Sequence, residues 1–214
     1  MNVDSLSDKS LFTGNNTLTS NFIGEYFLDD LSVCDDLIDF FHNSAYGKTN
    51  HRQGITTSGY DEKVKKSTDL EITPQMTFSA NSNYMRQLQS CCEKYIAQYP
   101  ACNIASPWRI VENYNIQWYK PGEGFFAFHC ERGNSREPSN ARHLVWMTYL
   151  NDVEDGGGTE FYNQNTIFKA EKGKTLIWPC DWTYVHRGQV SPTEHKYIIT
   201  GWYSFYSDPT KPGS

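Results

Sequence analysis

Short β-prone runs separated by turn residues fill the second half of this 214-residue chain, and this pattern limits its fold more than any other feature. After Trp108 the turn signals recur about every ten residues. The predicted strands cover residues 109–119, 125–131, 143–150, 159–162, 166–170, 175–178, 184–187 and 196–205. Strands of this length and spacing are typical of a sandwich or barrel. We therefore expect a mainly β fold of the double-stranded β-helix, or jelly-roll, type.

Aromatic residues make up 15% of the chain, with 14 Tyr, 12 Phe and 6 Trp. Flat aromatic side chains fit the pleated, half-buried surface of a sheet, so the core is expected to be aromatic-rich and β. A chain of this length fits one domain, and we predict a single domain over residues 1–214. Within it, residues 1–20 are expected to form a loose arm, 21–107 a helical support region and 108–206 the β core.

Two amphipathic helices are predicted before the strands, because apolar residues recur there at three- and four-residue steps. The first ends near residue 44, and the second covers about residues 79–99. Candidate N-cap residues are Asp29, Asp30 and Ser32 for the first helix and Ser79, Asn81 or Ser82 for the second. Both helices are expected to pack on one outer face of the β core.

The segments around these helices have weaker patterns. Residues 45–57 contain two glycines and no periodicity, which predicts a mobile loop. Its His51 and Arg52 are more simply read as solvated loop residues than as substrate contacts. Residues 61–72 end in an alternating pattern that predicts entry into a strand, and Pro74 ends it.

Charge and cysteine usage exclude several classes of function. The formal net charge of −6 offers no general attraction to nucleic acid or anionic membranes, so neither is expected as a partner. The sequence contains no long apolar run and no signal-peptide pattern, and we expect a cytoplasmic protein. Its six cysteines lack CxxC spacing, which predicts reduced thiols rather than a zinc cluster or a disulfide framework.

Three side chains have the spacing of a metal site. His129 and Glu131 lie two residues apart on a predicted strand, so their side chains share a face, and Cys130 between them points away. His186 follows on another predicted strand. Two histidines and a carboxylate can occupy one face of an octahedral iron(II) ion and leave other positions open. The bare pattern is weak because such sets also occur by chance. We assign none of the remaining histidines to metal.

Several motifs accompany these residues in a fixed order. They are Tyr119, the PGEG turn, His129 with Glu131, YLNDVEDGGGTEF, HRG, and Lys196 followed by Trp202. Over about residues 109–205, this order and spacing resemble the iron(II)- and 2-oxoglutarate-dependent dioxygenases of the prolyl 4-hydroxylase type. The earlier segment VKKSTDL is similar to members from phages and marine bacteria.

The resemblance assigns roles residue by residue. It implies that His129, Glu131 and His186 are the catalytic ligands of Fe(2+). Residues implied in binding the cosubstrate 2-oxoglutarate are Tyr119, Tyr149, Thr159, Lys196 and Trp202. Lys196 would pair with the far carboxylate of 2-oxoglutarate, because a lone lysine in the apolar run KYIITGWY is costly without an anion. Ordinary core packing remains the alternative for the two tyrosines.

Arg142 matches an arginine that touches the substrate in relatives, and a solvated surface arginine is the alternative. Two departures from the family pattern stand out. The carboxylate ligand is Glu131, where aspartate is commonest, and the turn reads GGGT where relatives often have GGET. Neither departure removes a ligand, so iron binding is expected to survive.

The resemblance implies an enzyme that uses Fe(2+), 2-oxoglutarate and O2, with ascorbate as a reductant. The expected reaction hydroxylates an unactivated C–H bond of a prolyl residue in a peptide or protein and releases succinate and CO2. A hydroxylase of a free amino acid or other small metabolite is the first alternative. A non-catalytic jelly-roll binding module with a vestigial metal site is the second. A cupin-like isomerase is a third, although it gives no reason for the position of Lys196.

Overall fold

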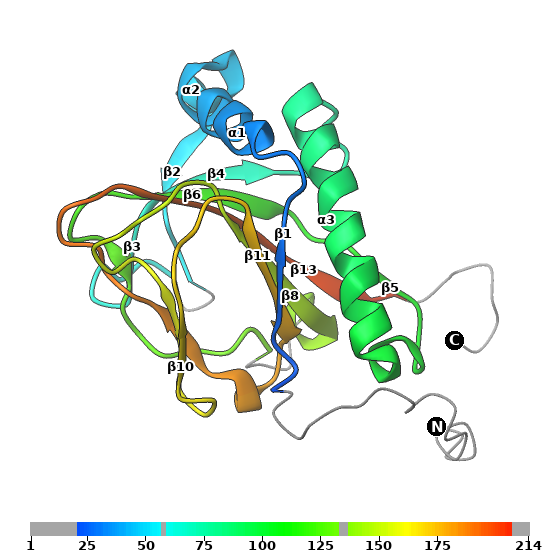
Figure 1. The fold of residues 1–214 in the computed structure, drawn as a ribbon. Helices are drawn as coiled ribbons and strands as arrows, with labels where there is room; N and C mark the ends of the chain where they lie inside the picture. The colour runs from blue at the N-terminus through cyan, green and yellow to red at the C-terminus, as the bar shows by residue number, and fades with distance from the viewer. Residues whose placement is uncertain (1–20, 57–58, 133–136, 207–214) are drawn as a thin grey trace.

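The computed structural model describes residues 21–56, 59–132 and 137–206, so the predicted arm at residues 1–20 lies outside the described residues. The largest sheet has eight strands in the order β1-β11-β8-β13-β6-β4-β2, with β5 paired to β13 (Figure 1). Its strands are β1 (Gly24–Phe27), β2 (His51–Gln53), β4 (Thr68–Ile72), β5 (Trp108–Arg109), β6 (Tyr114–Tyr119), β8 (Arg142–Tyr149), β11 (Lys174–Pro179) and β13 (Lys196–Phe205). The N-terminal region thus supplies strands to the sheet as well as helices.

A smaller antiparallel sheet, β10-β9-β12, completes the barrel with a two-stranded pair, β3 and β7. These strands are β3 (Lys65–Lys66), β7 (Gly124–Phe125), β9 (Thr159–Phe161), β10 (Thr166–Phe168) and β12 (His186–Gly188). One buried cluster joins side chains of β8, β11 and β13 with Phe161 of β9 and packs against Phe168 of β10. This mainly β arrangement confirms the predicted jelly roll.

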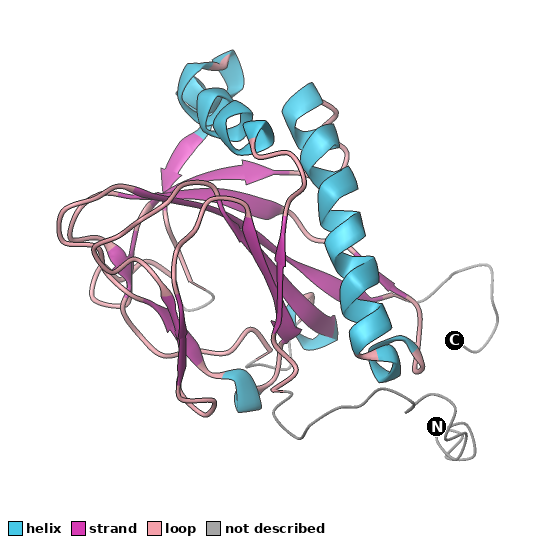
Figure 2. Ribbon diagram, in the orientation of Figure 1, coloured by secondary structure: helices cyan, strands magenta, loops and turns pink. Residues whose placement is uncertain are grey.

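Helices α1 (Ser32–Asn43) and α3 (Ser79–Gln98) lie on the outer face of the large sheet, as predicted (Figure 2). A second buried cluster includes Phe41 of α1, Tyr84 of α3 and Ile116 of β6. The N-cap residue of α1 is Leu31, which makes no side-chain cap bond, so the predicted polar cap of α1 is wrong; Asp30 accepts a hydrogen bond from the Ser32 backbone N–H beside it. The N-cap residue of α3 is Phe78, whose side chain makes no cap bond, so the predicted polar cap of α3 is wrong.

The prediction of a loop over residues 45–57 is wrong, because this segment forms helix α2 (Ala45–Asn50) and strand β2. The Ser44 hydroxyl caps α2 by accepting a hydrogen bond from the Gly47 N–H. A Cβ on Gly47 would lie 2.1 Å from the Phe41 carbonyl oxygen, so close packing explains a glycine inside this helix. His51 packs on Phe41, and Arg52 pairs with Glu71.

Other boundaries differ from the prediction. β1 was not predicted, and the run 109–119 divides into β5 and β6. The predicted strand 125–131 retains only Phe125 in β7, and the chain beyond it is irregular. Short 3-10 helices occupy Pro100–Asn103 (η3), Ser139–Ala141 (η4) and Trp182–Tyr184 (η5), the last at the start of the predicted strand 184–187.

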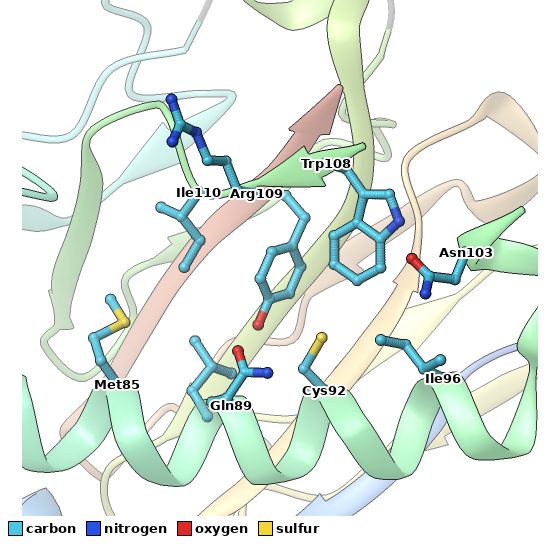
Figure 3. A pocket seen from close by; sticks show the side chains of 10 residues that line it. Met85, Gln89, Cys92, Ile96, Asn103, Trp108, Arg109 and Ile110 are labelled. Carbon is cyan, nitrogen blue, oxygen red and sulfur yellow. The ribbon is translucent and has the colours of Figure 1, made fainter. Parts of the chain in front are cut away.

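All six cysteines are free. Among the described helices, none has the length and apolar character needed to cross a membrane. A pocket of about 420 Å³ lies on the outer side of the large sheet, between α3 and β5 (Figure 3). Met85 and Cys92 of α3 and Trp108 of β5 contribute to its walls. None of the candidate site residues lines this pocket.

Candidate active site

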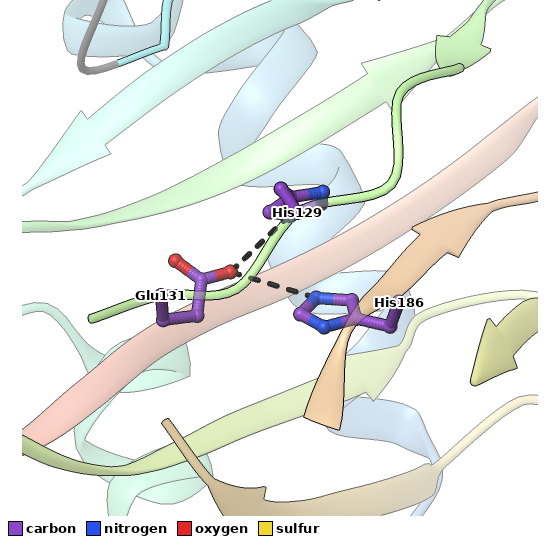
Figure 4. Close-up of side chains that lie close together, drawn as sticks. All are labelled: His129, Glu131 and His186. Carbon is purple, nitrogen blue, oxygen red and sulfur yellow. Dashed lines mark ion pairs between the residues drawn. The ribbon is translucent and has the colours of Figure 1, made fainter. Parts of the chain in front are cut away.

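His129, Glu131 and His186 lie together in the structure, and their possible ligand atoms are all within 4.8 Å of one another. Glu131 Oε1 lies 3.4 Å from His129 Nε2 and 3.5 Å from His186 Nε2 (Figure 4). His186 begins β12, whereas the other two side chains come from the irregular segment after β7. Reciprocal backbone hydrogen bonds between His129 and His186, at 3.0 and 2.9 Å, hold this segment beside β12.

Both histidines have one ring nitrogen fixed by the backbone. Nδ1 of His129 lies 3.1 Å from the Ala127 carbonyl oxygen, and Nδ1 of His186 lies 2.9 Å from the Tyr184 carbonyl oxygen. A carbonyl can only accept, so each Nδ1 donates, and Nε2 is the ring nitrogen that faces Glu131 and is available to a metal ion. Metal-binding histidines commonly have this arrangement. The donor set therefore fits an iron(II) ion.

Electrostatics keep the carboxylate charged. Burial alone would raise the pKa of Glu131, but hydrogen bonds and charge interactions with His129 and His186 hold it well below its usual value. Burial lowers the pKa of His186, which favours its neutral form. A neutral imidazole and an ionised carboxylate are the states that bind a metal.

The candidate ligands differ in their exposure to solvent, and His129 is more exposed than His186. The side chain of His129 is 22% exposed, compared with 8% for His186. Phe125 stacks on the His129 ring at a centroid distance of 3.7 Å, while Phe161 and Trp178 pack around His186. Small molecules would therefore reach the three ligands from the side of His129.

Lys196 is a buried cation with no carboxylate partner among the described residues. Its Nζ donates to the Gln189 carbonyl oxygen at 3.3 Å and lies 4.7 Å from the centre of the Tyr119 ring. Burial lowers the pKa of Lys196 to about 8. A Cβ on Gly188 would stand 3.3 Å from Nζ, so this glycine keeps the space beside the ammonium group free.

The predicted polar neighbours of the cosubstrate also lie in the barrel interior. Tyr119 pairs with Lys196 across β6 and β13, and its hydroxyl donates to Gln117 Oε1 at 2.6 Å. The hydroxyls of Tyr149 and Thr159 are hydrogen-bonded to each other. Burial, followed by the charges of Asp69 and Glu131, raises the pKa of Tyr119 well above its usual value, so it remains a neutral donor.

Arg142 and Trp202 lie next to Glu131 Oε2, the carboxylate oxygen that does not face the two histidines. Arg142 is only 8% exposed, which excludes the alternative of a solvated surface arginine. Its guanidinium group pairs with Glu112 and stacks on the Trp202 ring. The Trp202 indole N–H donates to Glu131 Oε2 at 3.0 Å.

A buried ion pair next to this site was missed in the sequence. Lys65 Nζ lies 2.8 Å from Asp69 Oδ2, with both side chains about 5% exposed or less, and Ser67 donates to Asp69 Oδ1. Lys65 lies opposite Phe125 in the β3–β7 pair, and Asp69 lies opposite Gln117. Charged residues are usually exposed, so only the alternation of Lys65, Ser67 and Asp69 in VKKSTDL, which contains β3 and the start of β4, could have suggested their burial.

Comparisons with known proteins agree with this geometry. Residues 114–204 match the family model described as the 2OG-Fe(II) oxygenase superfamily. A search of curated proteins finds no match. Among solved structures, a viral collagen prolyl hydroxylase from Paramecium bursaria Chlorella virus-1 is similar with a TM-score of 0.64 and 17% identity, covering 89% of this chain and 100% of the viral one.

Two further structures are similar. A Pseudomonas putida prolyl-4-hydroxylase has a TM-score of 0.65 and 14% identity, covering 89% of this chain and 96% of its own. A Trichoplax adhaerens prolyl hydroxylase, solved with a hypoxia inducible factor peptide fragment, has a TM-score of 0.66 and 18% identity, covering 94% and 90%. At these identities the likeness shows a shared fold.

Proposed function

We propose that this chain is a 2OG-Fe(II) oxygenase of the prolyl 4-hydroxylase type that hydroxylates a prolyl residue in a peptide or protein. The observation that carries this proposal is the His129, Glu131 and His186 cluster, together with the buried Lys196 of the same barrel, which pairs with no carboxylate of the described residues. The cluster would hold Fe(2+), and the ammonium group would hold 2-oxoglutarate.

Lys65 and Lys196 are two buried lysines near the candidate site, and they differ in their partners. Lys65 already pairs with Asp69, whereas Lys196 has only the Gln189 carbonyl oxygen among the described residues. An anion would therefore gain more from Lys196, where it offsets a charge that no described carboxylate pairs with. This contrast supports Lys196 as the partner of the far carboxylate of 2-oxoglutarate. The hydroxyls of Tyr119 and Thr159 would complete that end of the pocket.

When bound, iron and 2-oxoglutarate supply the oxidising chemistry: one oxygen atom of O2 enters the substrate C–H bond, and the other enters succinate as CO2 leaves. The protein's own residues hold and orient these groups. The Nδ1 hydrogen bonds of His129 and His186 fix the orientation of the two rings so that Nε2 faces the candidate metal position, and Glu131 supplies a negative charge. The family resemblance also implies that ascorbate acts as a reductant. Activity assays with and without ascorbate test this role.

A peptide substrate is supported by the similar structures, which include a collagen prolyl hydroxylase and a prolyl hydroxylase bound to a peptide fragment. The greater exposure of His129 leaves one side of the cluster accessible. Purified protein with Fe(II), 2-oxoglutarate and ascorbate should convert a proline-containing peptide to a product heavier by one oxygen atom, with one succinate per product. Mass spectrometry of a peptide panel and a free amino acid panel distinguishes a peptide substrate from a small metabolite. A gain on free amino acids alone would replace the peptide proposal with the small-metabolite alternative.

The affinity for 2-oxoglutarate should fall at alkaline pH. In the free protein the pKa of Lys196 is about 8, whereas a bound carboxylate would raise it, so binding above pH 8 requires uptake of a proton. Tyr119 does not titrate in this range, because its pKa is raised. We expect the Kd to increase about tenfold between pH 7 and pH 9. Calorimetry with Mn(II) in place of iron measures it.

Lys196→Arg provides the matched control for this pH dependence, because an arginine stays protonated throughout the range. Its Kd for 2-oxoglutarate should be nearly constant from pH 7 to pH 9, whatever its absolute value. A Kd that rises equally in both proteins would show that another group titrates on binding.

A further inference from the structure

The two oxygens of Glu131 have different surroundings. Oε1 faces the two Nε2 atoms, at 3.4 and 3.5 Å. Oε2 accepts a hydrogen bond from Trp202 Nε1 at 3.0 Å and lies 3.5 Å from Arg142 Nη1. One oxygen is thus directed toward the candidate metal position while the protein holds the other.

Arg142 is itself held from several directions. Its Nε and Nη2 donate to Glu112 at 2.7 to 3.1 Å, and its Nη1 donates to the Glu131 backbone carbonyl oxygen at 3.1 Å. Ser204 also donates to Glu112. The guanidinium carbon lies 3.5 Å from the centre of the Trp202 ring, so arginine and indole fix each other by stacking.

Glu131 needs such support for two reasons. Its side chain has one more rotatable bond than an aspartate and must lose more conformational freedom to bind a metal in one geometry. Its backbone also lies in the irregular segment after β7, where no regular strand fixes the direction of the side chain. Contacts from β8 and β13, which carry Arg142 and Trp202, provide that fixation.

We propose that Trp202 and Arg142 are positioning residues that hold Glu131 Oε2, so that only Oε1 binds the metal. The proposal rests on the proposed iron site. It gives Arg142 a role different from the substrate contact that the family resemblance implied. The indole N–H also prevents the longer carboxylate from turning both oxygens toward the ion.

Trp202→Phe tests this proposal, since phenylalanine removes the N–H donor and keeps an aromatic ring beside Arg142. We expect its affinity for Mn(II), measured by calorimetry, to fall about 10- to 100-fold, the usual effect of losing an outer partner of a metal ligand. At saturating Mn(II), the electron paramagnetic resonance spectrum of the bound ion should also change, because the carboxylate binds differently.

Trp118→Phe is the matched control, because Trp118 Nε1 donates to His195, away from the three candidate ligands. It should retain wild-type affinity and spectrum. Arg142→Lys is the second variant: it keeps the charge, loses the bidentate pair with Glu112, and should show the same two changes. Thermal unfolding verifies that each variant is folded.

Three results would contradict either the proposed iron site or the proposed positioning role of Trp202 and Arg142. If the wild-type protein does not bind Mn(II), the proposed iron site fails. If the wild type binds and folded Trp202→Phe and Arg142→Lys bind equally well, the positioning role is overturned. A loss of affinity with an unchanged spectrum also overturns it, because general loosening of the fold would produce that result.

Discussion

Replacing His186 with alanine is expected to abolish turnover and metal binding while leaving the protein folded. The change removes one of three ligand atoms and leaves Glu131 and His129 as an incomplete set. Metal affinity should fall by more than the about 10- to 100-fold that losing an outer partner of a ligand costs. Calorimetry with Mn(II) measures affinity, and succinate formation with Fe(II) and 2-oxoglutarate should fall to background.

His129→Ala provides a second test, because its ring is more exposed and its loss disturbs the core less. His195→Ala is the matched control: it removes an imidazole that accepts from Trp118, outside the proposed ligand set, and should retain metal binding. Circular dichroism verifies folding. Wild-type Mn(II) affinity in folded His186→Ala and His129→Ala would show that these histidines are not ligands.

Lys196→Met is expected to have opposite effects on binding and on stability. Removing one partner of a buried charge pair costs about 2–5 kcal/mol, so 2-oxoglutarate should bind about 30-fold to a few thousandfold more weakly. The free protein should instead become more stable. Burial lowers the pKa of Lys196 from 10.5 to about 8, which corresponds to up to about 3 kcal/mol of destabilisation at neutral pH.

The sign of this stability change depends on pH. The unfolded chain holds the Lys196 proton more tightly than the folded one, so the penalty is full below pH 8 and disappears as pH rises toward 10.5. Chemical unfolding of wild type and variant at pH 7 and pH 10 should therefore show a difference that shrinks at alkaline pH.

Lys174→Met is the matched control for Lys196→Met. Lys174 is also buried, but it pairs with Glu25 and Glu171 outside the candidate site. Its replacement should lower stability and leave 2-oxoglutarate affinity unchanged. Equal loss of affinity in both variants would remove the special role of Lys196.

The main elements of the fold could be predicted because their patterns are local. Strands β8 and β13 are short, mostly apolar runs, and helices α1 and α3 bury apolar faces that recur every three to four residues in the sequence. Helix α2 is too short to show such a period and depends on the Ser44 cap and on packing against Phe41. Strand β1 has only four residues, and its pairing with β11 is a long-range contact.

Part of the candidate site could be predicted from the sequence, for a different reason. His129, Glu131 and His186 were selected by residue type and spacing, yet a regular strand does not hold the first two together as expected. The backbone bonds to His186 do so instead. Pairings between distant residues, such as Arg142 with Glu112, leave no periodic signal, so the surroundings of the ligands required the structure.

Strand pairing also shows how much of the chain must be present for the candidate site to form. The family match covers residues 114–204, but β4 borders β6 and β1 borders β11, and both neighbours lie outside that span. A fragment of residues 114–204 would expose two sheet edges with unpaired backbone groups and the apolar face that α1 and α3 cover. Open sheet edges of this kind promote aggregation. The segment that the family model covers is therefore smaller than the unit that we expect to fold in water.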